Sequence, residues 1–268
     1  MVGVGKRKSK LHHTKNMLPK ITNKQQEILK YIYHFRFLNR IQIQALLKHK
    51  DYHLINTWLK DLTEKEYLNR IYSTKFIDNT KPAVYYIGKN GIDFIKTIVN
   101  CPKEQIKKLH REKDRSEHFA GSCQLLAHIY LELRSKSDDE TKYKVTTCTS
   151  FSNPDSPYNF LLDTTSNLVI EKESKGMKKY YLLEIFEPTL PLHSTRKRIK
   201  DYFDLYFSNS WENNTQELFP TLLLVCPTTP ALISTKRFAK KLLGEYEDID
   251  LKIQFETEQD VRGSNIFD

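Results

Sequence analysis

Two acidic side chains in the second half of the sequence stand beside strand-like segments and could together hold a divalent cation. Asp163 comes shortly before the apolar segment 168–171, and Glu184 stands near the end of a second such segment, 180–186. The first segment contains the β-branched Val169 and Ile170 and the second contains three aromatic residues, which indicates two strands. Carboxylates at such positions can hold Mg²⁺, so Asp163 and Glu184 are the candidate metal ligands.

Hydrolysis at such a site also needs a basic group that positions or activates the attacking water. The residue two positions beyond Glu184 is Phe186, where a Lys would complete an acidic-x-Lys triplet. The following helical segment supplies Arg198 and Lys200 instead. If the site is active, the candidate catalytic set is Asp163, Glu184 and Lys200, and Mg²⁺ is the only cofactor expected; if it is inactive, no cofactor is expected.

Residues 51–63 indicate a second kind of site, a polar face on a helix that could contact a ligand. Ile55, Trp58, Leu59 and Leu62 fall on one side of this helix and form its expected core face. The opposite side carries His53, Asn56, Thr57 and Lys60. Asn can bond adenine through two hydrogen bonds and Thr can contact a base edge, so this outer face is a candidate nucleic-acid surface.

The elements around this helix predict a winged helix-turn-helix over residues 21–100. A capping box at Thr22 and Gln25 begins a helix at 23–36, Asn39 caps a short second helix, and the helix 51–63 is the third. A hairpin and a closing helix follow. In this arrangement the third helix enters the major groove of DNA and the hairpin contacts the flanking backbone. The expected DNA-binding residues are Lys48, Lys50, His53, Asn56, Thr57, Lys60, Arg70, Lys75 and Lys81.

The charge distribution supports a polyanionic partner for this part. The chain of 268 residues has a net charge of +10, and residues 1–100 hold 19 Lys and Arg against 7 Asp and Glu. The excess positive charge therefore lies in the first third. We expect residues 1–20, which hold six cations and no acid, to form a basic, disordered tail, and the remaining excess lies in the segment behind it that is expected to fold.

Residues 101–115 are strongly charged and indicate a linker between two domains. Residues 116–258 then alternate in the order helix, three strands, helix, strand, helix, strand, with a short tail at 259–268. The strand segments include 143–151 and 251–255. This order predicts a mixed sheet flanked by helices. It is also the core order of PD-(D/E)xK, or restriction-endonuclease-like, domains. The expected fold class is therefore a two-domain α+β and α/β protein, with an N-terminal winged helix-turn-helix and a C-terminal nuclease-like domain built on a mixed sheet.

Composition excludes several other classes. An aromatic content of 12% and only 8 Gly and 10 Pro are typical of a globular chain. No apolar run approaches the roughly 20 residues of a membrane helix, and no secretory signal is present, so we expect a cytoplasmic protein without a membrane partner. The four cysteines form no C-x-x-C pair, and no phosphate-binding G-x-x-x-x-G-K-[ST] loop is present.

From Thr22 to Phe255 the chain resembles the replication-relaxation family of plasmids and other mobile elements. The resemblance implies an N-terminal winged helix joined to a C-terminal nuclease-like domain, and a role in plasmid replication initiation or in the DNA processing that precedes conjugative transfer. Its motifs are the module 21–98, Ser116-Glu117-His118-Phe119, Leu183-Glu184-Ile185, Arg198-Ile199-Lys200-Asp201-Tyr202 and Phe219-Pro220-Thr221-Leu222-Leu223.

Three functions follow as hypotheses. The first is a non-enzymatic, sequence-selective protein that binds double-stranded DNA, acts as a homodimer, and uses a non-catalytic nuclease-like domain for dimerisation or for recruiting a replication or relaxase protein. The second is a Mg²⁺-dependent endonuclease or nickase. The third is a transcriptional repressor of a plasmid operon. Nicking of plasmid DNA separates the second from the others, and the position of the bound site separates the third.

Overall fold

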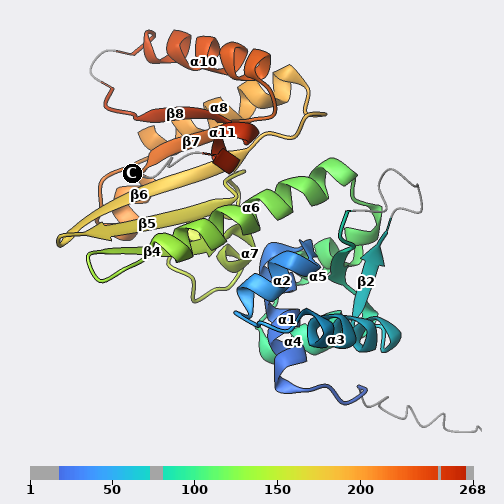
Figure 1. Cartoon of the computed structure of the whole chain (residues 1–268). Helices are drawn as coiled ribbons and strands as arrows, with labels where there is room; N and C mark the ends of the chain where they lie inside the picture. Colours follow the sequence, from blue (N-terminus) through green and yellow to red (C-terminus); the bar gives the residue numbers. More distant parts are fainter. Residues whose placement is uncertain (1–17, 73–80, 247–248, 264–268) are drawn as a thin grey trace, which may run out of the picture.

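The computed structural model describes residues 18–72, 81–246 and 249–263, and it contains helices and two sheets (Figure 1). The sheets belong to different parts of the chain. A three-stranded antiparallel sheet lies in the N-terminal part, and a five-stranded mixed sheet lies in the C-terminal part. The predicted combination of helices with a mixed sheet is confirmed.

The N-terminal part begins with three helices. At the first helix the predicted capping box is present, since Thr22 accepts from the backbone of Gln25 and the Gln25 side chain accepts from Thr22 N–H. Asn39 caps the second helix in the same way, through Gln42. The third helix is capped by Asp51. These helices are α1 (Asn23–Phe35), α2 (Arg40–Leu46) and α3 (Tyr52–Glu64).

A small sheet and a fourth helix complete this part. Strands β2 (Leu68–Ile71) and β3 (Val84–Ile87) form the predicted hairpin, and the short strand β1 (Leu38–Asn39), which the sequence did not predict, pairs with β3. The closing helix is α4 (Lys89–Ile98). Helix α4 packs closely on the backbone at Tyr67, because a Cβ at position 91 would overlap the Tyr67 carbonyl oxygen.

The segment predicted as a linker contains α5 (Lys103–His110) and the 3-10 helix η1 (Glu112–Asp114). Glu112 is buried, and its carboxylate pairs with the Arg36 guanidinium at 2.7 Å. Arg36 also lies 4.4 Å from the centroid of the Phe119 ring. These contacts tie the end of α1 to the segment that leads into the C-terminal part.

The C-terminal sheet has the strand order β4-β5-β6-β7-β8. The first three strands are antiparallel, whereas β7 runs parallel to β6 and β8 parallel to β7. The elements of this part are α6 (Glu117–Lys136), β4 (Thr141–Thr147), α7 (Cys148–Phe151), η2 (Asn159–Leu161), β5 (Leu168–Ser174), β6 (Met177–Ile185), α8 (Leu192–Phe207), α9 (Ser210–Thr215), β7 (Thr221–Cys226), α10 (Thr229–Leu243), β8 (Ile253–Thr257) and α11 (Glu258–Gly263).

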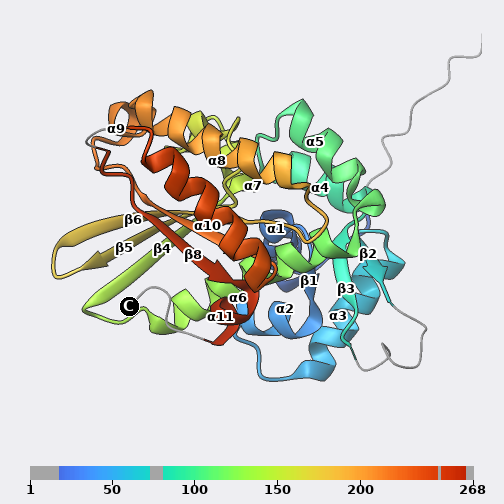
Figure 2. The ribbon, with the colours of Figure 1, turned by 90° about the horizontal axis from the view of Figure 1, so that it is seen from above.

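Helices cover both faces of this sheet (Figures 1 and 2). Alternate residues of each strand face opposite sides, so Leu183 and Leu223 join the core formed with α6 while Leu182 and Leu222 join the core formed with α8 and α10. The α6 core continues into the N-terminal helices. The side chain of Glu184 shares its face with Leu182 and therefore points toward α8.

The structure corrects the predicted strand 143–151. The strand ends at Thr147, where pairing with β5 ends, and Cys148–Phe151 form the short helix α7. Cys148 N–H still bonds to the Asn167 carbonyl, just before β5. Helices α9 and α11 were also missed. Helix α11 occupies residues 258–263 and packs against α6. Within the part of the chain that the structure describes, no helix is long and apolar enough to cross a membrane.

Candidate functional site

The outer face of α3 is exposed along its length, as the sequence predicts. His53, Asn56 and Thr57 are exposed, while Ile55 and Leu59 are fully buried. The burial pattern follows from helical geometry, because residues three or four positions apart share a face. The helix therefore presents a polar surface to solvent instead of packing it against a neighbouring element.

Lys60 gives this surface an accessible positive charge. Its side chain is 77% exposed, and it pairs at 3.8 Å with the carboxylate of Glu64, which is 64% exposed. An ion pair of this kind contributes little free energy, so exchange of Glu64 for a phosphate is inexpensive. Lys65 is instead engaged with Asp61 at 2.8 Å, on the side of the helix that faces α1.

The link between α2 and α3 adds two further cations next to the helix. Lys48 and Lys50 are both exposed, and Lys48 adopts a left-handed backbone conformation with φ of 51° at the end of α2. Asp51 is used as the cap of α3, where it accepts from His53 N–H and Leu54 N–H. Its negative charge is therefore partly neutralised at the helix N-terminus.

The hairpin lies beside α3 on the same side of the molecule (Figures 1 and 2). Arg70 on β2 is exposed, and its guanidinium lies 5.7 Å from the centroid of the Tyr72 ring. Lys81 is also exposed, at the start of the segment leading into β3. The predicted contact residue Lys75, like most of the predicted turn and residues 1–17 of the basic tail, lies outside the described residues.

Glu184, the candidate metal ligand on β6, is fully buried and already engaged by two side chains. Its Oε1 atom accepts from Arg198 Nη1 at 2.7 Å, and its Oε2 atom accepts from the Thr165 hydroxyl at 2.6 Å. Arg198 comes from α8 and is 29% exposed. Burial raises the pKa of the Glu184 carboxyl, against the opposing effects of Thr165 and Arg198.

Tyr202 completes the surroundings of this carboxylate. It follows Arg198 by four residues on α8, so both side chains face the same strand. The Tyr202 side chain is buried, and burial together with the charge of Glu184 raises the pKa of its hydroxyl well above the ordinary range. The cluster Thr165, Glu184, Arg198 and Tyr202 thus joins the β6 strand to α8 through a buried ion pair.

The structure does not bring Asp163, Glu184 and Lys200 into one group. Asp163 is exposed on the turn after η2, and Lys200 is exposed on α8, two residues and about 200° around the helix from Arg198. A Mg²⁺ ion at Glu184 would have to displace the guanidinium from Oε1, so these residues do not fit the metal. Throughout residues 18–72, 81–246 and 249–263, no group of three or more His, Cys, Asp or Glu side chains is placed to hold a metal ion.

Sequence reasoning missed Thr165 and Tyr202 as partners of Glu184. The spacing of Arg198 and Tyr202 was a usable signal, because it places a cation and a hydroxyl on one helical face. Thr165 gave no such signal, since it lies in an irregular segment whose path depends on η2 and on the strand that follows. His118, at the start of α6, is exposed.

Comparison with known proteins identifies the family. The family model described as replication-relaxation matches residues 29–222, and the chain belongs to that family. No curated protein matches the chain. Among solved structures, the chain is similar to restriction endonuclease FokI, with 8% sequence identity, a TM-score of 0.31, and coverage of 89% of this chain and 42% of that protein. The chain thus spans less than half of the length of FokI.

Proposed function

We propose that this chain is a sequence-selective protein that binds double-stranded DNA, with α3 entering the major groove. The observation that carries the proposal is the exposed outer face of α3, which presents His53, Asn56, Thr57 and Lys60 to solvent with the hairpin beside it. The arrangement of three helices, a hairpin and a closing helix agrees with a winged helix-turn-helix. In that class the third helix contacts base edges and the hairpin contacts the backbone.

Charge provides the affinity in this proposal, and the polar side chains provide selectivity. Five exposed cations suit contacts with phosphates, whose neutralisation releases counterions. They lie on α3, in the link before it and on the hairpin: Lys60, Lys48, Lys50, Arg70 and Lys81. Asn56 and Thr57 suit contacts with base edges, where a good bidentate pair discriminates by about 1–3 kcal/mol. The membership of the replication-relaxation family supports a role at a replication origin or in the DNA processing before conjugative transfer.

The C-terminal part is proposed to be a nuclease-like scaffold that does not catalyse cleavage. The engagement of Glu184 by Arg198 and Thr165 supports this view, because both carboxylate oxygens already have partners. Such a scaffold can pair two subunits or recruit a replication or relaxase protein. A homodimer is proposed because one recognition helix covers few base pairs, and two half-sites raise the affinity through effective concentration.

The test begins with selection of a bound duplex from a random library, followed by measurement of its affinity at several salt concentrations. The variant Lys60→Ala should weaken binding and reduce the salt slope by about 1, as expected for the loss of one phosphate contact. The variant Asn56→Ala should instead relax the base preference at one position, with the salt slope unchanged. Lys107→Ala on α5 is the matched control, since Lys107 is an exposed lysine that pairs with Glu104.

Equal salt slopes for Lys60→Ala and the Lys107→Ala control, together with an unaltered base preference for Asn56→Ala, would contradict the proposed surface. The non-catalytic assignment has its own test. Supercoiled plasmid incubated with the protein and Mg²⁺ or Mn²⁺ should remain intact. Nicking that disappears in Asp163→Ala or Glu184→Ala would support the endonuclease alternative. A selected site that overlaps a promoter, not an origin, would support the repressor.

A further inference from the structure

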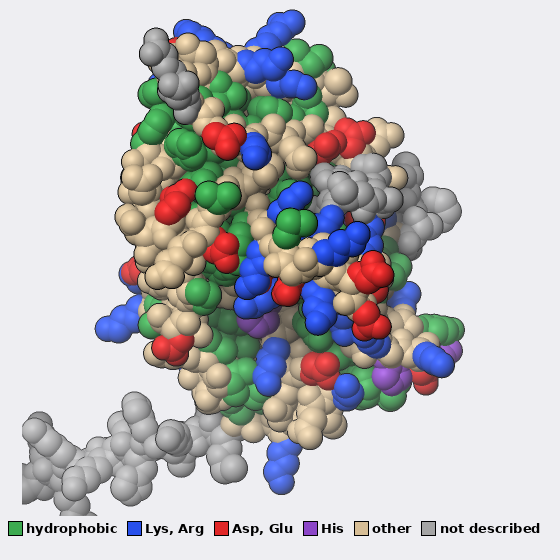
Figure 3. Space-filling model, turned by 90° about the vertical axis from the view of Figure 1, so that its left-hand side faces the viewer, with side chains coloured by type: hydrophobic (Ala, Val, Ile, Leu, Met, Phe, Trp, Pro, Cys, Tyr) green, Lys and Arg blue, Asp and Glu red, His purple; other side chains and the backbone are tan. Residues whose placement is uncertain are grey.

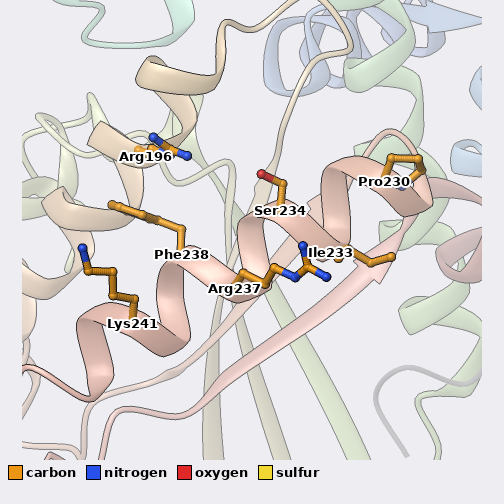
Figure 4. A pocket seen from close by; sticks show the side chains of 7 residues that line it. All are labelled: Arg196, Pro230, Ile233, Ser234, Arg237, Phe238 and Lys241. Atoms are coloured by element: carbon orange, nitrogen blue, oxygen red, sulfur yellow. The ribbon is translucent and has the colours of Figure 1, made fainter.

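A groove of about 570 Å³ lies between α8 and α10, in the C-terminal part of the molecule (Figure 4). Arg196 enters it from α8, whereas the other lining side chains belong to α10. Helix α10 lies at the opposite end of the molecule from α3 in Figure 1, with α6 and the sheet between them. The groove is therefore separate from the outer face of α3 that is proposed to bind DNA.

Three cations line the groove without a carboxylate among the lining residues. Arg196, Arg237 and Lys241 are exposed, and no ion pair involves any of them in the part of the chain that the structure describes. Arg237 and Lys241 are four residues apart, so they share a helical face about 6 Å apart along the axis. Figure 3 shows Lys and Arg side chains gathered at the top of the molecule, over the end of α10.

The sequence of α10 explains this local charge. Residues 229–243 contain Lys236, Arg237, Lys240 and Lys241 and no Asp or Glu. The net charge of residues 101–268 is −2, so the cationic face of α10 could not be detected from the net charge of the C-terminal part. The three cations that line the groove have no ion-pair partner among the described residues, so they repel one another, and an anionic ligand relieves that repulsion.

Apolar side chains form the rest of the groove. The Arg196 guanidinium lies 5.3 Å from the centroid of the Phe238 ring, and Ile233 is 44% exposed. A guanidinium above an aromatic ring offers a flat surface on which a further planar group can stack. The groove therefore combines positive charge with an accessible apolar and planar surface.

We propose that the α8–α10 groove binds single-stranded nucleic acid. A single strand carries a phosphate on every nucleotide and also leaves its bases free to stack, which matches both properties of the groove. A duplex keeps its bases stacked inside, so it would satisfy the cations and leave Ile233 and Phe238 uncovered. An acidic peptide carries fewer planar groups, and it serves as a competing ligand in the test.

The experiment uses the full chain and a short fluorescent deoxythymidine oligonucleotide, with binding followed by anisotropy at several salt concentrations. The triple variant Arg196→Ala/Arg237→Ala/Lys241→Ala should bind the oligonucleotide on the order of tenfold more weakly or worse, with a salt slope smaller by about 2, because a single strand contributes about 0.7 per phosphate contact. The control triple variant Lys107→Ala/Lys178→Ala/Lys252→Ala removes the same charge from exposed lysines that lie near carboxylates.

Equal losses in the two triple variants would overturn the proposal, because they would show a general effect of net charge. Equal loss of binding to a duplex of unrelated sequence, or stronger binding of a polyglutamate peptide than of the oligonucleotide, would also overturn it. The groove variant should keep its affinity for the selected duplex, and Lys60→Ala should keep its affinity for the oligonucleotide. This cross-comparison separates failure of the groove from failure of the α3 surface.

Discussion

The buried pair of Glu184 and Arg198 leads to a quantitative prediction about stability. Arg198→Met removes the cation and leaves the carboxylate buried with only hydroxyl partners, those of Thr165 and Tyr202. Breaking a buried pair in this way costs about 3–5 kcal/mol. Because Arg198 is partly exposed, water can enter in its place, so we expect a value near the lower end of that range, about 3 kcal/mol at neutral pH.

The cost should depend on pH with a defined sign. Burial raises the pKa of Glu184 in the folded protein above its ordinary value of 4.5, and loss of the guanidinium removes an effect that lowers it. Protonation of a carboxyl with a raised pKa favours the folded state. The free-energy difference between Arg198→Met and the parent should therefore be smallest below pH 4.5 and grow as the pH rises through the folded pKa.

Urea unfolding followed by circular dichroism measures these differences. Lys197→Met is the matched control, because Lys197 is the neighbouring residue on α8, is 76% exposed and pairs with Asp201; it should change the stability by less than about 0.5 kcal/mol. Combining Arg198→Met with Glu184→Gln removes both charges and keeps an acceptor for Thr165, so at least about half of the loss should return. Equal costs for Arg198→Met and Lys197→Met at neutral pH would refute the reasoning.

Two further predictions concern the N-terminal part and α6. Burial and the charge of Lys30 lower the pKa of His34 below 6.5. The contribution of neutral His34 to stability is therefore present above pH 6.5 and is lost as the pH falls through the folded pKa. In denaturant titrations at several pH values, His34→Gln should flatten the fall in stability below pH 6.5. Gly91→Ala should destabilise by roughly 1–3 kcal/mol because its Cβ would overlap the Tyr67 carbonyl oxygen. Gly121→Ala, with open space around it in α6, should instead stabilise by about 0.5–1 kcal/mol. Thermal unfolding followed by circular dichroism measures both variants, and a shift of the same sign in the two would contradict this account.

Local sequence patterns were sufficient for the elements that depend on neighbouring residues. The capping box at Thr22 and the cap residue Asn39 predicted two helix starts, and the periodicity of residues 51–63 predicted both the core face and the exposed face of α3. The boundary between β4 and α7 was not predictable from local sequence patterns. Residues 143–151 all suit a strand, and only the tertiary structure shows that pairing with β5 ends at Thr147 and that Cys148–Phe151 form a helix.

The sequence by itself determined the family, the mixed α/β character and the polar outer face of α3, because helical and strand periodicities act over a few residues. Only the tertiary structure decided which cation meets Glu184 and which cations gather between α8 and α10. Arg198 and Lys200 are equivalent candidates along the chain, but a helix places them on different faces, and only packing of α8 on β6 selects Arg198. Arg196 and Lys241 are 45 residues apart in the numbering and share a groove only because the two helices pack side by side on one face of the sheet.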